Sequence, residues 1–164
     1  MVCVDGFILT HAYERMDVPD QEQVDRFLPP FEPRQVLDPS DPISIGAMVG
    51  PEAFTEVRYM EHHKQLKALE IIPEINKEFK EIFGRDSGGL ISTYRADDAD
   101  TLIVTLGSVI GTISEVIDEM RDKGQKIGAM TIRSFRPFPL DEIHEVLKKT
   151  QRVVVFEKCL AVGL

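Results

Sequence analysis

Three short apolar segments in the C-terminal part of the chain constrain the fold most. They read TLIVTL at residues 101–106, KIGAMTIR at 126–133 and RVVVFE at 152–157. Each is rich in the aliphatic and β-branched residues that favour strands, and a helical pattern separates each pair. Because parallel neighbouring strands need such a crossover connection, the sequence predicts an α/β fold. We expect three α/β/α layers around a mainly parallel sheet.

The two helical patterns between these strands carry apolar residues on one face only, as helices that cover a sheet do. The apolar positions are Ile113, Val116, Ile117 and Met120 in the first pattern, and Leu140, Ile143 and Leu147 in the second. Thr112 and Glu115 have the spacing of a capping box, so Thr112 is expected near the start of the first helix. Gly124 is expected to end it.

The first half of the chain has a different composition. Seven of the ten prolines fall between residues 18 and 51. Proline lacks an amide donor and restricts the residue before it, so at most a short helix fits, at residues 21–28. Residues 55–83 carry an apolar helical stripe, in which Pro73 marks either a kink or the start of a second helix. Residues 1–10 are interpreted as the end of a strand, although no sheet partner for it is obvious further along the chain. Residues 90–94 are interpreted as a further short strand.

Composition excludes several classes of function. The formal net charge of −9 opposes binding to phosphate backbones, and no apolar run is long enough to span a bilayer. No signal peptide is recognisable, so we expect a cytoplasmic protein that binds neither nucleic acid nor membrane. Two cysteines, Cys3 and Cys159, cannot build a four-thiolate cluster and are expected to be reduced and buried. No metal site is expected in this chain.

Two pairs of residues are candidates for ligand binding. Gly107 and Ser108 follow a strand and precede a helix, and such a turn can bind phosphate through helix amides. The segment lacks the P-loop lysine and the dinucleotide fingerprint, and the alternative is tight packing with Ser108 or Thr112 as a cap. Arg133 and Arg136 follow the next strand at the edge where ligands usually bind. They would hold a phosphate or carboxylate, or else form structural salt bridges.

The ordered set of motifs resembles a known family. The segments LGS, GT, IDEMRDKGQKIGAMTIRSFRPFP and VVVFEK resemble the transketolase C-terminal-type domain of thiamine-diphosphate enzymes. Upstream, VDGFILTH at 4–11, the helical segment at 62–85 and YRADDADTLIVTLGS at 94–108 are similar to the alpha subunit of pyruvate:ferredoxin oxidoreductases. The resemblance covers nearly the whole chain.

This resemblance implies an enzyme that oxidatively decarboxylates pyruvate with CoA to acetyl-CoA and CO2. Its cofactors would be thiamine diphosphate, Mg2+ and [4Fe-4S] clusters, ferredoxin would take the electrons, and the alpha chain would assemble with beta, gamma and delta subunits. Residues 1–55 would be the C-terminal end of the pyrimidine-binding domain with a proline-rich linker. Residues 56–85 would be a connecting helix or kinked helix pair, and 86–164 a transketolase C-terminal-like domain II, incomplete at its C-terminus.

The same resemblance implies a structural role for this chain. The family's activating glutamate and substrate-contacting threonine are expected before residue 1, so no catalytic residue is carried over. We expect a subunit-packing function, with no cofactor bound and no activity in isolation. The alternatives are a subunit of another 2-oxoacid oxidoreductase, acting on indolepyruvate or 2-oxobutyrate, and a stand-alone module that binds an anionic ligand of the CoA type.

Overall fold

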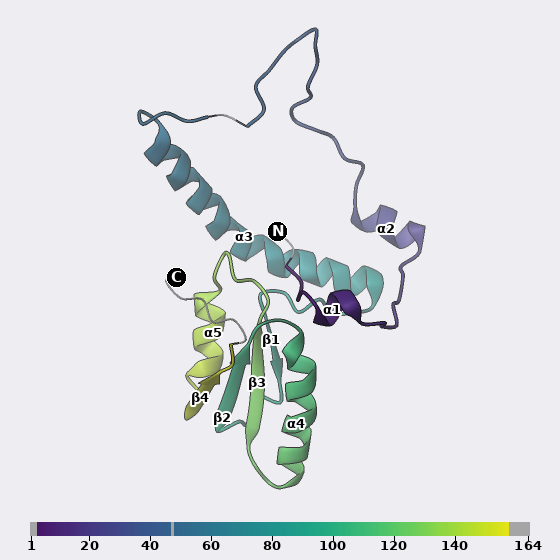
Figure 1. The fold of residues 1–164 in the computed structure, drawn as a ribbon, viewed down its shortest axis with the longest axis vertical. Helices are drawn as coiled ribbons and strands as arrows, with labels where there is room; N and C mark the ends of the chain where they lie inside the picture. The colour runs from purple at the N-terminus through teal and green to yellow at the C-terminus, as the bar shows by residue number, and fades with distance from the viewer. Residues whose placement is uncertain (1–2, 47, 158–164) are drawn as a thin grey trace. The chain divides into compact units, whose positions relative to one another are not determined.

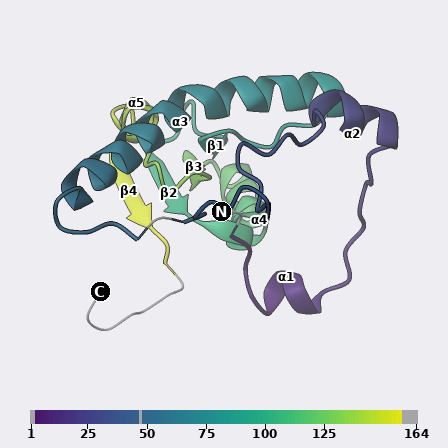
Figure 2. The ribbon, with the colours of Figure 1, turned by 90° about the horizontal axis from the view of Figure 1, so that it is seen from above.

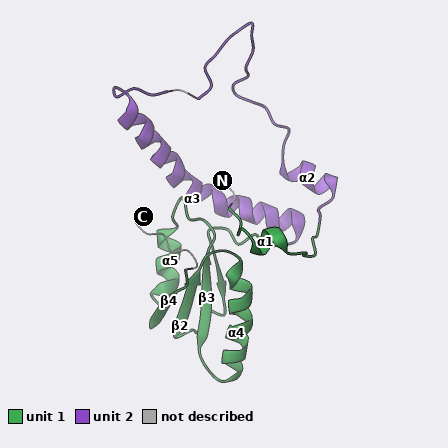
Figure 3. Cartoon of the chain, in the orientation of Figure 1, with its two compact units in different colours: residues 1–17, 86–164 green, residues 18–85 purple. Residues whose placement is uncertain are grey.

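A computed structural model describes residues 3–46 and 48–157 of the chain (Figure 1). The chain forms two compact units (Figure 3). Met1–Asp17 and Asp86–Leu164 make up the first unit, and Val18–Arg85 makes up the second. The N-terminal segment therefore groups with the C-terminal half of the chain, and the second unit is inserted between them.

A four-stranded sheet is the centre of the first unit. Its strands are β1 (Ile91–Tyr94), β2 (Thr101–Thr105), β3 (Ile127–Ile132) and β4 (Arg152–Val155), in the order β1-β3-β2-β4. Strand β2 runs parallel to both β3 and β4, whereas β1 is antiparallel to β3. The predicted mainly parallel sheet is confirmed, and its antiparallel member is the edge strand β1.

Helices α4 (Ile110–Asp122) and α5 (Leu140–Leu147) cover opposite faces of this sheet (Figures 1 and 2). Side chains alternate between the two faces of a strand. Leu102 and Met130 accordingly pack on the side of Ile143 in α5. Ala129 packs on the other side, with Ile117 of α4. The three-layer α/β/α architecture is thus confirmed, with an apolar core on each side of the sheet.

The N-terminal segment differs from its expected structure. Residues 8–11 form the short helix α1 (Ile8–His11), and no described residue of the segment pairs with a strand. Asp5 and Gly6 interrupt the apolar run, Phe7 takes a positive φ of 65°, and the Ile8 amide donates to the Gly6 carbonyl at 2.8 Å. This turn prevents the extended conformation that the apolar composition favours. Cys3 is exposed rather than buried, and Cys159 lies outside the described residues.

Helix α4 begins earlier than the sequence predicts. A 3-10 turn, η1 (Gly107–Val109), leads directly into it, so that Thr112 lies inside the helix. Neither η1 nor α4 has a side-chain cap at its N-terminus from the residue before it. The expected capping box of Thr112 and Glu115 is therefore wrong, because the chain already turns at Gly107, whose φ is 74°.

The second unit consists of α2 (Gln21–Phe27), α3 (Phe54–Phe83) and the proline-rich segment between them. The predicted short helix is confirmed as α2, which begins at a capping box of Asp20 and Gln23. Helix α3 continues through Pro73 as one helix of 30 residues and ends at Gly84, whose φ is 69°. Within the described ranges, no helix combines the length and apolar character that a membrane span requires.

Candidate functional site

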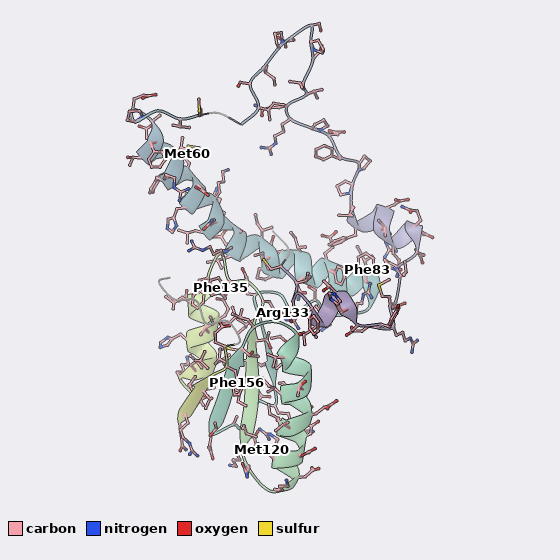
Figure 4. All side chains as sticks on the ribbon, viewed as in Figure 1. Met60, Phe83, Met120, Arg133, Phe135 and Phe156 are labelled. Atoms are coloured by element: carbon pink, nitrogen blue, oxygen red, sulfur yellow. The ribbon has the colours of Figure 1, made fainter. Side chains whose placement is uncertain are left out.

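The carboxyl ends of β2 and β3 bring the sequence-predicted residues to one edge of the sheet. Helix α4 follows β2 on one face, and α5 follows β3 on the other. The two connections leave these neighbouring strands in opposite directions, which is the arrangement at which open α/β sheets usually bind ligands. Gly107 and Ser108 follow β2 after one intervening residue, and Arg133 and Arg136 are the first and fourth residues after β3. Figure 4 labels Arg133 and Phe135 in this region.

The turn after β2 is occupied by a carboxylate from the N-terminal segment. The Ser108 backbone amide donates to Oδ2 of Asp5 at 2.5 Å. Gly107 has a φ of 74°, and a Cβ on it would lie 2.6 Å from Oδ1 and 2.9 Å from Oδ2 of Asp5. Glycine is therefore required here for its backbone conformation and for the space that the carboxylate fills. The sequence suggested Ser108 or Thr112 as the cap, whereas the cap is Asp5, 103 residues away from Ser108.

Backbone contacts hold the segment after β3 in place. The amides of Arg133 and Ser134 both donate to the Leu90 carbonyl, at 2.9 and 3.0 Å. The Arg133 side chain passes close to Gly88, where a Cβ would lie 3.0 Å from Nε. Within residues 3–46 and 48–157, neither Arg133 nor Arg136 takes part in an ion pair, and both side chains are exposed. The salt-bridge alternative for these arginines has no support among the described residues.

The rest of this loop is ordered by its own side chains. Ser134 Oγ donates to the Pro137 carbonyl at 2.8 Å, and the Arg136–Pro137 peptide bond is cis. The rings of Phe135 and Phe138 meet edge to face, with centroids 6.1 Å apart. Arg136 therefore lies in a compact loop, between two half-exposed phenylalanines in the sequence.

A network of charged residues lies at the other end of the parallel strands, near the amino ends of β2 and β3. Arg121 donates through Nη2 to the Arg95 carbonyl at 2.6 Å and to Oδ1 of Asp98 at 2.8 Å. Its Nε donates to the Ile127 carbonyl at 2.7 Å. The hydrogen bond from Arg121 lowers the pKa of Asp98 below its ordinary value, against a smaller opposing effect of burial. These contacts join α4 to β3 and to the turn before β2, which is a structural function.

Asp118 forms a second part of this network. Both of its carboxylate oxygens accept from the Tyr94 hydroxyl, at 2.9 and 2.8 Å, and Oδ1 also lies 2.7 Å from Arg95 Nε. Among the residues that the structure describes, no three His, Cys, Asp or Glu side chains converge as metal ligands would. The acidic turn at 97–100 thus contributes Asp98 to an ion pair with α4.

Comparison with protein families gives two matches that together span most of the chain. Residues 1–77 match the thiamine diphosphate-binding model of pyruvate flavodoxin/ferredoxin oxidoreductase. Residues 99–164 match pyruvate:ferredoxin oxidoreductase core domain II. Asp5 lies in the first matched region and Ser108 in the second, so the contact at Gly107 joins the two.

Curated relatives align with nearly the whole chain. Pyruvate synthase subunit PorA of Methanosarcina barkeri is 45% identical over 99% of this chain and 40% of its own length. The PorA subunit of Methanothermobacter thermautotrophicus is 45% identical over 96% of this chain and 41% of its own length. Ketoisovalerate oxidoreductase subunit VorA of Pyrococcus horikoshii is 37% identical over 99% of this chain and 42% of its own length. The chain thus spans about two fifths of the length of these relatives.

A solved structure also matches part of the chain. It is a 2-oxoglutarate:ferredoxin oxidoreductase from Magnetococcus marinus, 22% identical, with a TM-score of 0.41. The match covers 57% of this chain and 16% of that one.

Proposed function

This chain belongs to the pyruvate:ferredoxin oxidoreductase family, and from that premise we propose that it forms part of the alpha subunit of a pyruvate synthase. The enzyme would decarboxylate pyruvate oxidatively, transfer the acetyl group to CoA, release CO2 and reduce ferredoxin in the cytoplasm. The observation that carries this proposal is the 45% identity to a PorA subunit over 99% of the chain. Beta, gamma and delta subunits would complete the enzyme, and its cofactors would be thiamine diphosphate, Mg2+ and [4Fe-4S] clusters.

The described residues do not fit thiamine diphosphate at the turn where the sequence suggested a phosphate site. The Ser108 amide already donates to the Asp5 carboxylate, and that carboxylate fills the space beside Gly107. A diphosphate placed there would face a negative charge at close range. Thiamine diphosphate would therefore bind in other parts of the assembled enzyme.

The function that fits the chain is architectural. The sheet, α4 and α5 supply a packed domain, and its carboxyl edge carries exposed arginines and aromatic rings. We propose that this domain packs against neighbouring subunits so that the cofactor is held between chains. In isolation the chain is expected to show no turnover.

Reconstitution tests the proposal. A full-length alpha subunit that includes residues 1–164 is co-expressed with the remaining subunits, and complex formation is measured by native mass spectrometry. Reduction of methyl viologen is then measured with pyruvate and CoA. We expect a complex with pyruvate- and CoA-dependent turnover, and none from the isolated chain. Pyruvate-dependent turnover by the isolated chain would refute the architectural function, and the absence of any complex would refute the subunit assignment.

The preferred 2-oxoacid is a separate question. The 45% identity to PorA, against 37% to VorA, favours pyruvate over 2-oxoisovalerate. Substrate profiling of the complex with pyruvate, 2-oxoisovalerate, 2-oxobutyrate and indolepyruvate is expected to give the highest kcat/KM for pyruvate. A higher kcat/KM for any of the other three would reassign the subunit within the family.

A second function, binding of an anionic ligand of the CoA type, is favoured by one observation. Arg133 and Arg136 are exposed at the carboxyl edge and form no ion pair within the described residues. Titration calorimetry with CoA tests this, using Arg136→Ala and, as a control, Arg152→Ala at the start of β4. Binding that weakens only in Arg136→Ala would support the second function. Equal affinity in the wild type and both variants would exclude Arg136 from CoA binding.

A further inference from the structure

We propose that Asp5 is a positioning residue, whose carboxylate holds the N-terminal segment against the first turn after β2. Naming the two joined parts as domains of a pyruvate synthase alpha subunit rests on the proposed function, whereas the contact between Asp5 and Ser108 does not depend on it. Asp5 lies in the region that matches the thiamine diphosphate-binding model, and Ser108 in the region that matches core domain II. Asp5 would therefore connect the end of the first domain to the second.

The electrostatics of the turn favour a negative group at this position. The first amides of a helix have no partners within the helix, and its dipole places partial positive charge at this end. Leu106, the residue before η1, supplies no side-chain acceptor, and Val109 before α4 supplies none either. The Asp5 carboxylate meets this requirement at 2.5 Å from the Ser108 nitrogen, with the added strength of an ionised acceptor.

The residues on both sides of the contact are fitted to each other. Gly107 lacks the Cβ that would lie within 3 Å of both Asp5 oxygens. On the other side, Gly6 and Phe7 form the tight turn that precedes α1, and Asp5 itself is half-buried. A small residue in the turn and a short acidic side chain opposite it distinguish this contact from a chance surface interaction.

The position of the contact explains why the N-terminal segment belongs to the first unit. Met1–Asp17 groups with Asp86–Leu164, although 68 residues of the second unit, 18–85, separate them along the chain. None of the described residues in this segment is buried, so burial of apolar side chains contributes little to holding it. The charged hydrogen bond from the Ser108 amide to Asp5 is then one of the polar contacts that position it.

The test uses the NMR signal of the Ser108 amide in the full chain. In the wild type, its chemical shift is expected to follow a carboxyl titration at acidic pH, because Asp5 is the acceptor. In Asp5→Asn, which keeps the shape of the side chain, this titration is expected to disappear. Glu14→Ala is the matched control, since it removes one negative charge from the same segment, and its Ser108 titration should equal that of the wild type.

Hydrogen exchange gives a second readout. Loss of a hydrogen bond to a charged group is expected to speed exchange of the Ser108 amide roughly ten- to a hundredfold in Asp5→Ala. A Ser108 shift that shows no carboxyl titration in the wild type overturns the proposal even if Asp5→Ala does not fold. Failure of the proposed function is distinguishable, because the subunits would then form no active complex while the Ser108 amide still titrates.

Discussion

At the scale of single residues, Gly128 in β3 is a position where any added side chain would clash with the backbone of a neighbouring segment. A Cβ there would lie 2.4 Å from the Arg95 carbonyl oxygen and 3.0 Å from the Ala96 Cα. Both atoms belong to the backbone, so they cannot move aside without displacing the turn after β1. We expect Gly128→Ala to lower the free energy of unfolding by about 3 kcal/mol, measured by urea denaturation.

Gly111 provides the matched control for this substitution. It lies within α4, and a Cβ on it would meet no atom within 4 Å. Alanine also has a higher helix propensity than glycine, so Gly111→Ala should raise the free energy of unfolding by roughly 0.5–1 kcal/mol. Equal effects of the two substitutions would show that the close approach at Gly128 is relieved by local movement.

The ion pair of Asp98 with Arg121 predicts a pH dependence at the same scale. Arg121 lowers the pKa of Asp98, mainly through a hydrogen bond to the ionised carboxylate. Because the folded-state pKa is lower than the unfolded one, this contribution to stability is present above about pH 4 and is lost as pH falls through the folded-state pKa. Asp98→Asn should therefore lower Tm at pH 6 and lower it less at more acidic pH, as the carboxylate becomes protonated.

The effect is expected to be small, because the Asp98 side chain is 60% exposed and solvent screens such pairs. Asp97→Asn serves as the control, since it removes a neighbouring exposed carboxylate that has no contact with Arg121 among the described residues. A Tm difference for Asp98→Asn that is the same at pH 6 and at more acidic pH would exclude the ion pair as its cause.

The candidate site was predictable only where local pattern and topology determine it. Gly107, Ser108, Arg133 and Arg136 follow two strands that the sequence marks clearly, and the carboxyl ends of parallel strands lie at one edge. Asp5 was not predictable, because its partner is 103 residues away and no local spacing encodes such a cap. The only local sign was a polar Asp5-Gly6 pair that interrupts an apolar run.

At the scale of elements, α2 depends on contacts with α3. Isolated helices of seven residues are unstable in water. The Phe27 ring meets Phe79 and Phe83 edge to face, with centroids 5.5 and 5.4 Å apart. Gln23 Nε2 also donates to the Ile82 carbonyl at 3.1 Å. These contacts, with the capping box, account for the stability of a helix as short as the flanking prolines allow.

We therefore expect Phe27→Ala to unfold α2 locally. Removal of the half-buried ring should lower the free energy of local unfolding by about 2 kcal/mol, which is less than for a fully buried phenylalanine. Hydrogen exchange followed by mass spectrometry should show residues 21–27 losing protection. Leu28→Ala, which removes the neighbouring and 60% exposed side chain, should leave their protection unchanged. Protection that persists in Phe27→Ala would mean that the capping box and Gln23 suffice.

Helix α3 shows what an apolar stripe predicts and what it leaves open. The stripe correctly indicated a helix over residues 55–83, but it allowed either a kink or two helices at Pro73. The structure has one helix, Phe54–Phe83. Proline removes a single hydrogen bond from the helix ladder, and a helix of 30 residues retains the bonds on either side of it. The local sequence therefore predicts the loss of helix stability at Pro73. It does not predict whether the hydrogen bonds in the rest of the helix compensate for that loss.

At the scale of the whole molecule, the alternation of strands and helices predicted the layers but not the strand order. After each crossover helix, the next strand can pair on either side of the preceding strand. No local sequence pattern determines which side it takes. The order β1-β3-β2-β4 places β4 at an edge, where every residue of the strand is exposed. Val155 is 72% exposed there, so among residues 3–46 and 48–157 β4 is an apolar edge strand.

Net charge is what opposes association through this edge. An exposed apolar edge strand favours pairing between copies, whereas a net charge of −9 at pH 7 makes copies repel one another. The repulsion vanishes near the sequence pI of about 4.9.

We expect light scattering to show a monomer at pH 7 in low salt and self-association near pH 4.9. Val155→Lys and Val36→Lys change the charge equally, and Val36 is also exposed but lies outside the sheet. With each variant measured at its own pI, only Val155→Lys should suppress association, and equal suppression by both would exclude pairing through β4 as its cause.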